Sequence, residues 1–524
     1  MVNITLFGGV SEIGGNRIQL QEGDSNIFLD FGVSFSREKE YFEFPLLRPA
    51  NKEDLFKLNL LPKIPGLYQD QGFYPVYNTD GTFKVEGACE PSCVSAILLS
   101  HAHMDHYGYF GLLREDIPIY MSEVSKKFVE LRNRVGNQQW NLYIENNDLR
   151  EMEKDKELVV NNFSIKRYDV DHSILGASGY IIKANGKTIG YTGDFRFHGH
   201  RGYLTEEFLS ALKNEHIDVL ITEGTRIPKP QKLGEKAAEQ RVFNSEKEVL
   251  DKCVDIISKE DGLVLYDMSS ADLDRVRTLW KVSRKTGRKL VVDSRKAYLL
   301  LYINAERKIV DELPQIDDFQ IYLNRHKFRS GKLFDDFSKG HDIYAESFEY
   351  SRSKHEGELT VKQQCCSKLK KKVKTLEDYK KQYKNPYLFE IEDDQFLWGP
   401  NGRQKILDNS NEYIIITSNG MQTMLHFKPE HCGIGGLYIY GKAEPFNEEM
   451  RLSFKRLQNW LEICNFELNY SHTSGHIGRD VMRDFLDEIK PQKIIPIHTE
   501  KPEKFIELTK ADILIPTLGK TYHF

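Results

Sequence analysis

Short apolar runs recur along the first half of the chain, and most of them end in polar or charged residues. Val94 to Ser100 is the clearest example, because its length is typical of a buried strand. Similar runs predict strands over 3–9, 26–30, 163–168, 179–184, 188–192 and 219–222, and helices are expected over 122–135 and 206–212. This mixture predicts stacked β-sheets with outer helices.

Helical and strand-like patterns alternate later in the chain, between about residues 235 and 445. Helices are expected over 246–259 and 271–286, and strands over 263–266, 289–292, 412–417 and 436–440. Such alternation predicts a parallel sheet in a separate α/β domain. The chain then closes with a strand, a helix and a strand, over 466–469, 480–489 and 493–497.

The length of 524 residues exceeds what a single hydrophobic core accommodates, so two domains are expected. We predict the class α/β, with an α+β sandwich as the body. The body would begin with residues 1–230, be interrupted by an inserted domain over 231–447, and be completed by a return segment over 448–524.

The composition, with 40% apolar and 29% charged residues, is that of a soluble globular protein. We find no basic leader and no apolar run of membrane-spanning length, which favours a cytoplasmic protein without membrane contact. The seven cysteines are an odd number, so free thiols are expected. A net charge of −5 provides no global attraction to nucleic acid, so binding would need a local basic surface.

Three segments leave two interpretations open. The lysine-rich run 368–384 is either a solvated helix face or a surface that follows phosphates. Aromatic residues such as Tyr68 and Tyr74, in the proline-punctuated stretch 33–85, either stack on bases or hold that stretch against the body. Cys89 and Cys93 have no second pair nearby to complete a metal site, so a loop turn at Pro91 is favoured.

The strand 94–100 leads directly into a dense cluster of metal-ligating side chains. His101, His103, Asp105 and His106 place three imidazoles and a carboxylate within six positions. Imidazole and carboxylate are suited to zinc or manganese, and so dense a set normally serves two ions. More ligands are needed to complete the coordination shells of two ions. Three candidates follow predicted strands: His172, Asp194 and His498.

These motifs resemble those of the metallo-β-lactamase superfamily. His101 to His106, His172 and Asp194 are similar to its second, third and fourth motifs, and Asp30 to its first. Three further segments resemble motifs A, B and C of the β-CASP nucleases: Thr222 to Thr225, His472 to His476 and Pro496 to His498. Gly8 to Gly14 is similar to the N-terminal turn of the ribonuclease J family. Because the chain ends soon after His498, we expect it to lack that family's C-terminal domain.

The resemblance implies an αββα metallo-β-lactamase fold with an inserted β-CASP domain. It also implies two Zn²⁺, or Mn²⁺, with Asp194 bridging them. His101, His103 and His172 would hold one ion, and Asp105, His106 and His498 the other. Asp30 would orient an imidazole from behind the ligands. Two such ions can hold a bridging hydroxide that attacks phosphorus.

The same resemblance assigns the leaving-group proton to His476, supported by Glu223, with Asp105 also in the catalytic set. His472 and Ser474 lie on a turn that either holds a substrate phosphate or has no ligand.

The expected function is hydrolysis of RNA phosphodiesters, leaving 5′-phosphate and 3′-hydroxyl, by exonuclease or endonuclease action. RNA is favoured over DNA because histidine at motif C, here His498, resembles the RNA-processing members. The alternatives are a hydrolase of small esters, a DNA nuclease, and a nucleic-acid-binding protein with a degenerate site. Oligomeric state is open, a homodimer included, and no protein partner is indicated.

Overall fold

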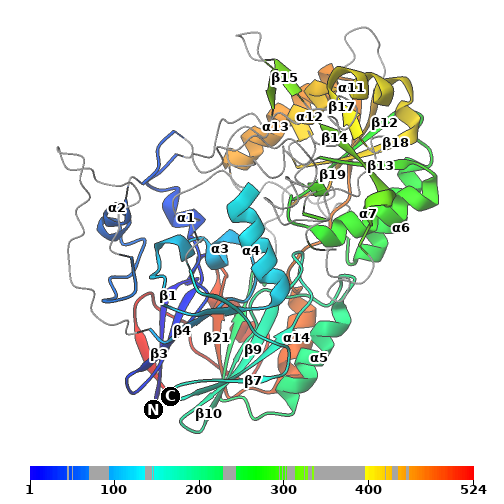
Figure 1. Ribbon diagram of the computed structural model, residues 1–524. Helices are drawn as coiled ribbons and strands as arrows, with labels where there is room; N and C mark the ends of the chain where they lie inside the picture. Colours follow the sequence, from blue (N-terminus) through cyan, green and yellow to red (C-terminus); the bar gives the residue numbers. More distant parts are fainter. Residues whose placement is uncertain are drawn as a thin grey trace, which may run out of the picture. The chain divides into compact units, whose positions relative to one another are not determined.

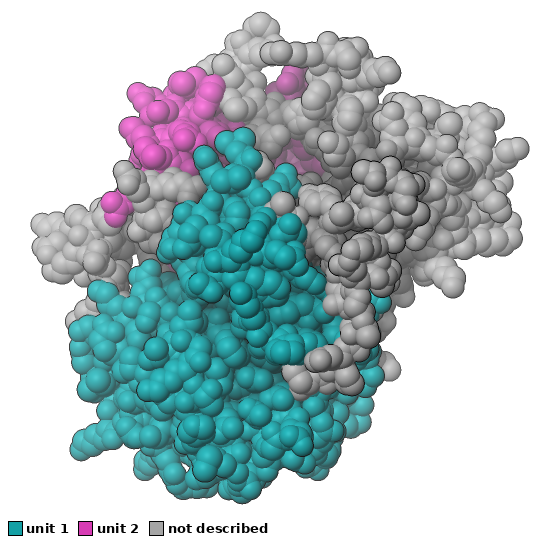
Figure 2. Space-filling model, turned by 90° about the vertical axis from the view of Figure 1, so that its left-hand side faces the viewer, with its two compact units in different colours: residues 1–133, 138–231, 475–524 teal, residues 134–137, 232–474 magenta. Residues whose placement is uncertain are grey.

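The computed structural model describes residues 1–69 except 44, 45 and 50, residues 94–135, 144, 147–227, 243–293, 396–418, 420–427, 435–443 and 448–524, and short pieces within 296–335. The chain forms two compact units (Figures 1 and 2). Unit 1 comprises Met1–Asn133, Gln138–Gln231 and Gly475–Phe524. Unit 2 comprises Arg134–Asn137 and Lys232–Ser474.

Unit 1 contains two sheets, each with seven strands among the described residues. The first sheet has the order β23 (Thr521–His523), β1 (Val2–Gly8), β2 (Arg17–Glu22), β3 (Ser25–Leu29), β4 (Ala96–Leu98), β5 (Ile119–Met121), β6 (Leu149–Glu151). The second has the order β22 (Asp512–Ile513), β21 (Lys493–Ile497), β11 (Val219–Glu223), β10 (Lys187–Tyr191), β9 (Ser178–Ala184), β8 (Phe163–Asp169), β7 (Glu157–Val160).

Burial of apolar side chains holds the two sheets face to face. One core cluster combines inward residues of both sheets, such as Ile4 and Leu20 from the first and Ile182 and Ile221 from the second. A second cluster covers the outer face of the second sheet, where helices α5 (Gly202–Lys213) and α14 (Arg479–Ile489) pack (Figure 1). The other helices of this unit include α1 (Phe35–Glu38), α2 (Lys52–Lys57) and α3 (Met104–Tyr107). The body is therefore a layered sandwich of two sheets, with helices against the outer face of the second, which agrees with the stacked sheets and outer helices predicted from the sequence.

Unit 2 contains the expected parallel sheet. Its order in the described residues is β17 (Phe396–Trp398), β14 (Phe319–Leu323), β13 (Lys289–Asp293), β18 (Tyr413–Thr417), β12 (Leu263–Asp267), β19 (Gly436–Tyr440), β20 (Phe466–Tyr470), with every pair parallel. Its helices include α6 (Glu246–Ile257), α7 (Leu273–Thr286), α11 (Gly399–Asp408), α12 (Gly420–His426) and α13 (Glu448–Ile463).

The return to unit 1 comes later than the sequence analysis placed it. Strand β20, expected in the return segment 448–524, instead pairs with β19 at the edge of the parallel sheet. The apolar side chains Leu457, Leu461 and Phe466 belong to the core of that sheet. Because these residues bury their apolar surface in unit 2, the boundary lies between Ser474 and Gly475.

The aromatic stretch 33–85 is described as far as residue 69. Tyr68 is only 8% exposed, its ring meets Phe31 and Phe56 edge-on, and its hydroxyl donates to Pro62 O at 2.6 Å. A ring held in this way is not available to stack on bases, so that interpretation of Tyr68 is wrong. Tyr74, the cysteines 89 and 93, and the lysine-rich run 368–384 lie outside the described residues.

Two further expectations concern membranes and thiols. No helix in the described part of the chain has the length and apolar character needed to cross a membrane. Cys253 and Cys464 are buried thiols.

Truncating an inward residue of the two-sheet core should destabilise unit 1. Ile182 is fully buried between the sheets, so Ile182→Ala should lower the free energy of unfolding by about 2–5 kcal/mol through lost burial and a residual cavity. Val159 on β7 is 65% exposed, so the control Val159→Ala should change it by less than about 0.5 kcal/mol. Urea unfolding measures both, and equal effects would contradict this core.

Candidate metal centre

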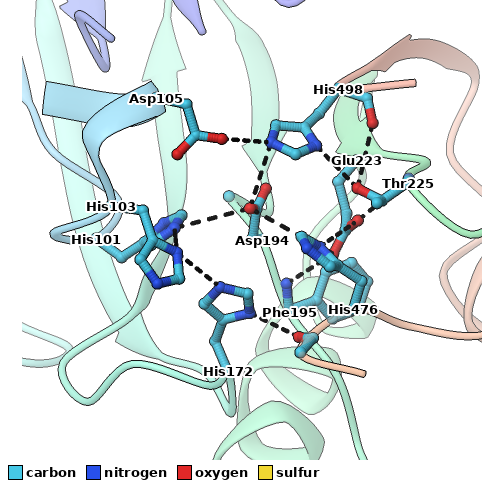
Figure 3. Close-up of polar contacts among 12 residues, drawn as sticks. His101, His103, Asp105, His172, Asp194, Phe195, Glu223, Thr225, His476 and His498 are labelled. Atoms are coloured by element: carbon cyan, nitrogen blue, oxygen red, sulfur yellow. Dashed lines mark hydrogen bonds and ion pairs between the residues drawn. The ribbon is translucent and has the colours of Figure 1, made fainter. Parts of the chain in front are cut away.

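The expected ligands of unit 1 follow the carboxyl ends of its strands. Asp194 comes after β10 and His498 directly after β21, while Glu223 is the last residue of β11 between them. These three strands are parallel neighbours, so their ends meet at one edge of the sheet. His172 follows β8, and His101 follows β4 of the facing sheet. Figure 3 shows the side chains converging around Asp194.

A single helical turn presents the next ligands. His103 has extended backbone angles at the N-cap of α3, and Asp105 and His106 lie in the helix that follows. The amide of His106 donates to His103 O at 2.9 Å. This turn closes the loop after β4 and brings the cluster 101–106 to one centre.

His101, His103 and His172 form the first group of ligand atoms. Nδ1 of His103 lies 3.0 Å from Nε2 of His101 and 3.2 Å from Nε2 of His172. Nδ1 of His172 donates to Gly475 O at 2.6 Å. With that proton committed to the carbonyl, Nε2 of His172 presents a lone pair to the group.

Asp105, His106 and His498 form the second group. Oδ2 of Asp105 is 3.3 Å from Nε2 of His498 and 3.9 Å from Nε2 of His106. Oδ2 of Asp194 lies between the groups, at 3.3 Å from His106 Nε2, 3.5 Å from His498 Nε2 and 3.7 Å from His101 Nε2. Asp194 is therefore placed to share one carboxylate between two positive centres.

Asp30 orients His106 from behind. Its buried carboxylate accepts the Nδ1 proton of His106 at 2.7 Å, the amide of Ser100 at 2.6 Å and the hydroxyl of Ser100 at 2.8 Å. It also accepts a hydrogen bond from the hydroxyl of Tyr191. These donors fix the ring of His106 so that Nε2 faces the cluster. On the other side, Thr225 Oγ1 lies 2.8 Å from Nδ1 of His498 and has the same orienting role.

Two residues of this site have left-handed backbone angles. Asp30 has φ +55° and His498 has φ +51°, a region that non-glycine residues seldom adopt and that clusters at functional sites. A close approach also demands glycine at position 32, because a Cβ there would stand 1.7 Å from Asp105 O. The backbone is therefore locally strained at His498, a candidate ligand, and at Asp30, which orients the ligand His106.

Burial and neighbouring charges set the protonation of the ligands. Burial lowers the pKa of His103 to about 4, and it lowers the pKa of His101 and of His172 well below the usual range. Burial also disfavours the charged forms of His106 and Asp194. The opposite charges around them nevertheless raise the pKa of His106 and lower that of Asp194. His101, His103 and His172 are therefore neutral and Asp194 is ionised, the forms that bind cations, whereas a cation at His106 would have to displace the proton of that ring.

His476 and Glu223 form a pair beside the cluster. Nδ1 of His476 is 3.1 Å and 3.0 Å from the two carboxylate oxygens of Glu223 and 3.8 Å from Asp194 Oδ2. Burial alone would lower the pKa of His476, but Glu223 and Asp194 raise it to about 9. Glu223 also accepts the amides of Phe195 at 3.0 Å and Thr225 at 3.3 Å. Since Glu223 is committed to these donors, we do not count it as a ligand.

The residues present fit divalent cations. Nε2 of His106 and Oδ1 of Asp194 are buried and make no hydrogen bond to any residue that the structure describes. Buried polar atoms without partners cost about 1–3 kcal/mol each, and ligation by a cation would satisfy both. The donors are imidazoles and carboxylates, which suit Zn²⁺ and Mn²⁺.

Two residues expected to contact a substrate phosphate come just before the boundary between the units. His472 and Ser474 belong to unit 2, where Nδ1 of His472 is 3.1 Å from Gly441 O, and neither is in a group of ligand atoms found among the described residues. Ser100, Tyr191 and Thr225 also contact residues of the site and were not among the residues predicted from the sequence. The adjacency of Ser100 to His101 was a usable signal, whereas nothing in the pattern of β10 distinguishes Tyr191.

The sequence matches two known domain families. The family described as beta-lactamase superfamily domain matches residues 84–240, and the family described as Zn-dependent metallo-hydrolase RNA specificity domain matches residues 467–510. The first match includes the cluster 101–106, His172 and Asp194. The second includes His476 and His498.

Relatives of known name and one solved structure are also similar. Ribonuclease J 2 of Streptococcus pyogenes is 23% identical over 56% of this chain and 45% of its own length. Ribonuclease J of Pyrococcus abyssi is 24% identical over 56% of this chain and 58% of its own length. The chain thus spans about half the length of these curated relatives. The crystal structure of a protein of unknown function from Enterococcus faecalis shares the fold, with a TM-score of 0.68, 21% identity and 99% of both chains covered.

Removing the shared carboxylate should weaken metal binding. In Asp194→Asn the side chain keeps its shape but loses the charge that faces three imidazoles, so the affinity for Zn²⁺ or Mn²⁺ should fall by at least about 10- to 100-fold. Asp484→Asn, at an exposed position on α14, is the control and should bind as wild type does. Titration of metal-free protein followed by elemental analysis measures this. Unchanged binding by Asp194→Asn would place the metal elsewhere.

Proposed function

We propose that this chain, a ribonuclease J-like protein of the metallo-β-lactamase superfamily, is a metal-dependent ribonuclease that hydrolyses RNA phosphodiesters at the centre around Asp194. The observation that carries the proposal is the position of Asp194, which lies next to both the ligand cluster and the pair formed by His476 and Glu223. Its Oδ2 lies within 3.7 Å of three imidazoles of the ligand cluster. The same atom is 3.8 Å from His476, which Glu223 supports.

The ligand assignment follows the two groups of donor atoms. His101, His103 and His172 would hold one cation, and Asp105, His106 and His498 a second, with Asp194 shared. We propose Zn²⁺, with Mn²⁺ as an alternative. When bound, two such cations lower the pKa of water to provide a nucleophile at neutral pH and neutralise charge on the phosphate.

His476 is proposed as the general acid. Its pKa of about 9 keeps the ring protonated at neutral pH. Since Nδ1 faces Glu223, Nε2 is the atom that would give its proton to the leaving 3′-oxygen. As water adds to phosphorus and the P–O3′ bond breaks, the products carry a 5′-phosphate and a 3′-hydroxyl. His476 is then reprotonated from solvent.

RNA is proposed as the substrate for two reasons. The segment that carries His476 and His498 matches a family whose description names RNA specificity. The two relatives described above are ribonucleases J by name. We also propose that His472 and Ser474 contact a substrate phosphate, through the turn that precedes His476. Exonuclease and endonuclease action both remain compatible with this proposal, as does a homodimer.

Cleavage of RNA should require both the metal ligands and the general acid His476. With Zn²⁺ or Mn²⁺, wild-type protein should cleave a 5′-monophosphorylated RNA, and Asp105→Ala and His476→Ala should each lose cleavage by at least about 100-fold. The DNA counterpart and a small ester serve as competing substrates in the same assay. Cleavage of the ester without cleavage of RNA would replace this proposal with small-molecule hydrolysis. Binding of RNA without turnover would indicate a degenerate site.

Glu223→Gln should slow cleavage without loss of metal. The amide keeps the size of the side chain but removes the charge that holds His476 protonated, so kcat should fall by about 10²- to 10⁴-fold. Metal content, measured by elemental analysis, should stay at the wild-type level. Loss of metal from this variant would show that Glu223 is a ligand, against our assignment.

A further inference from the structure

A buried ion pair in unit 1 lies beside two of the proposed ligands. Asp171 directly precedes His172, and Arg196 follows Asp194 by two positions. The side chains of Asp171 and Arg196 are 0% and 1% exposed, and Oδ2 of Asp171 lies 3.3 Å from Nε of Arg196. The ion pair therefore connects the segment that carries His172 with the segment that carries Asp194.

The backbones of these two segments are joined at the same point. The amide of Arg196 donates to Asp171 O at 2.8 Å, which forms an isolated antiparallel bridge between the two residues. Thr205 is a fully buried residue of α5. Its hydroxyl accepts a hydrogen bond from the amide of Asp171 at 2.9 Å and donates to Arg196 O at 2.7 Å. The side chain of Thr205 thus holds both segments against α5.

A close approach of the chain encloses the carboxylate of Asp171. The amide of Gly199 donates to Oδ2 of Asp171 at 2.7 Å. A Cβ at position 199 would lie 2.4 Å from that oxygen and 2.5 Å from Nη2 of Arg196, so this position requires glycine. We refer to Asp171, Arg196, Gly199 and Thr205 as the Asp171 network.

The Asp171 network is better suited to fixing positions than to stabilising the fold. Two buried charges lose so much hydration that well-packed apolar side chains often stabilise a protein equally well. Hydrogen bonds in a buried network make the surrounding structure rigid, because each donor fixes the position of its acceptor. Here the structure that becomes rigid is the pair of segments that present His172 and Asp194 to the metal centre.

We propose that the Asp171 network positions the ligands of the first cation by fixing the separation of His172 from Asp194. His172 is a ligand of the first group, and Asp194 is the carboxylate shared by both groups. The ligands of the second group come from α3 and from the residue that follows β21. Loss of the network should therefore affect the first cation more than the second. This inference rests on the ligand assignment given with the proposed function.

Two variants test the proposal. Asp171→Asn keeps the size of the side chain and removes the charge that faces Arg196. Thr205→Val keeps the shape of the side chain and removes the hydroxyl that joins the two segments, while the ion pair stays. Because residues behind the ligands alter metal affinity by about 10- to 100-fold, the first Zn²⁺ should bind about 10- to 100-fold more weakly in both variants. The affinity for the second Zn²⁺ should change by less than about threefold.

Asp218→Asn is the matched control. The carboxylate of Asp218 accepts the amide of Thr188 at 2.9 Å and pairs with Lys187 at 3.2 Å. It therefore joins a backbone amide and a cation, as Asp171 does, but at the start of β10, whereas Asp194 follows the end of that strand. Asp218→Asn should change thermal stability without changing the affinity for either Zn²⁺.

Titration of metal-free protein with Zn²⁺ against a chromophoric chelator measures both affinities. Anomalous diffraction from crystals grown at limiting Zn²⁺ then identifies the site that is lost, which in Asp171→Asn should be the one among His101, His103 and His172. If Asp171→Asn does not fold, Thr205→Val decides alone. Wild-type affinity at the first site in any test variant that folds would overturn the inference, as would equal weakening of both sites or the same loss in Asp218→Asn.

Zinc binding separates this inference from the proposed function. If wild-type protein binds two Zn²⁺ but cleaves no RNA, the proposed function fails, yet selective loss of the first cation in Asp171→Asn would still support the positioning role. If wild-type protein cleaves RNA and the test variants bind both Zn²⁺ as wild type does, the positioning role fails and the proposed function stands. Binding of fewer than two Zn²⁺ by wild-type protein would overturn the ligand assignment, and this inference with it.

Discussion

The structure depends on the cost of burying imidazoles and carboxylates together at one edge of a sheet. His101, His106 and Asp194 are almost fully enclosed, and Nε2 of His106 and Oδ1 of Asp194 have no hydrogen-bond partner among the described residues. Burial of charge is unfavourable unless an opposite charge or a metal compensates for the lost hydration. Divalent cations would supply that compensation, and their ligation would add to the stability of unit 1.

The fold of unit 1 meets this constraint by its topology. The parallel strands β10, β11 and β21 bring Asp194, Glu223 and His498 to one edge, and the facing sheet adds His101. The carboxylate of Asp30 lies behind the ligands and accepts a hydrogen bond from His106. It is held in place by the amide and hydroxyl of Ser100 and by the hydroxyl of Tyr191. The ligand positions are therefore set by strands and by hydrogen bonds rather than by loops alone.

Much of this arrangement could be predicted from local sequence. Apolar runs that end in His or Asp mark strand ends, and strand ends of parallel neighbours meet, so Asp194 and His498 were identifiable before any coordinates. The layered body and the parallel sheet of unit 2 also follow from periodicity. These patterns involve residues that are close together in the chain, so they can be recognised without knowing which distant residues are in contact.

What could not be predicted depends on contacts between residues far apart in the chain. Whether β20 belongs with β19 or with the body is decided by packing of Leu457 and Phe466, and periodicity does not report the partner of a strand. The burial of Tyr68 against Phe31 and Phe56 is invisible for the same reason. In the sequence, Arg275 has the pattern of an ordinary charged position on a helix. Its partners Glu246 and Ser471 lie 29 and 196 positions away, so the local pattern does not reveal these contacts.

The measurement that tests the central claim most directly is anomalous X-ray diffraction at the zinc absorption edge, from crystals grown with Zn²⁺. Our account predicts two anomalous peaks on either side of Asp194, one among His101, His103 and His172 and the other among Asp105, His106 and His498. Absence of anomalous signal at Asp194, with zinc present in the crystal, would contradict the account.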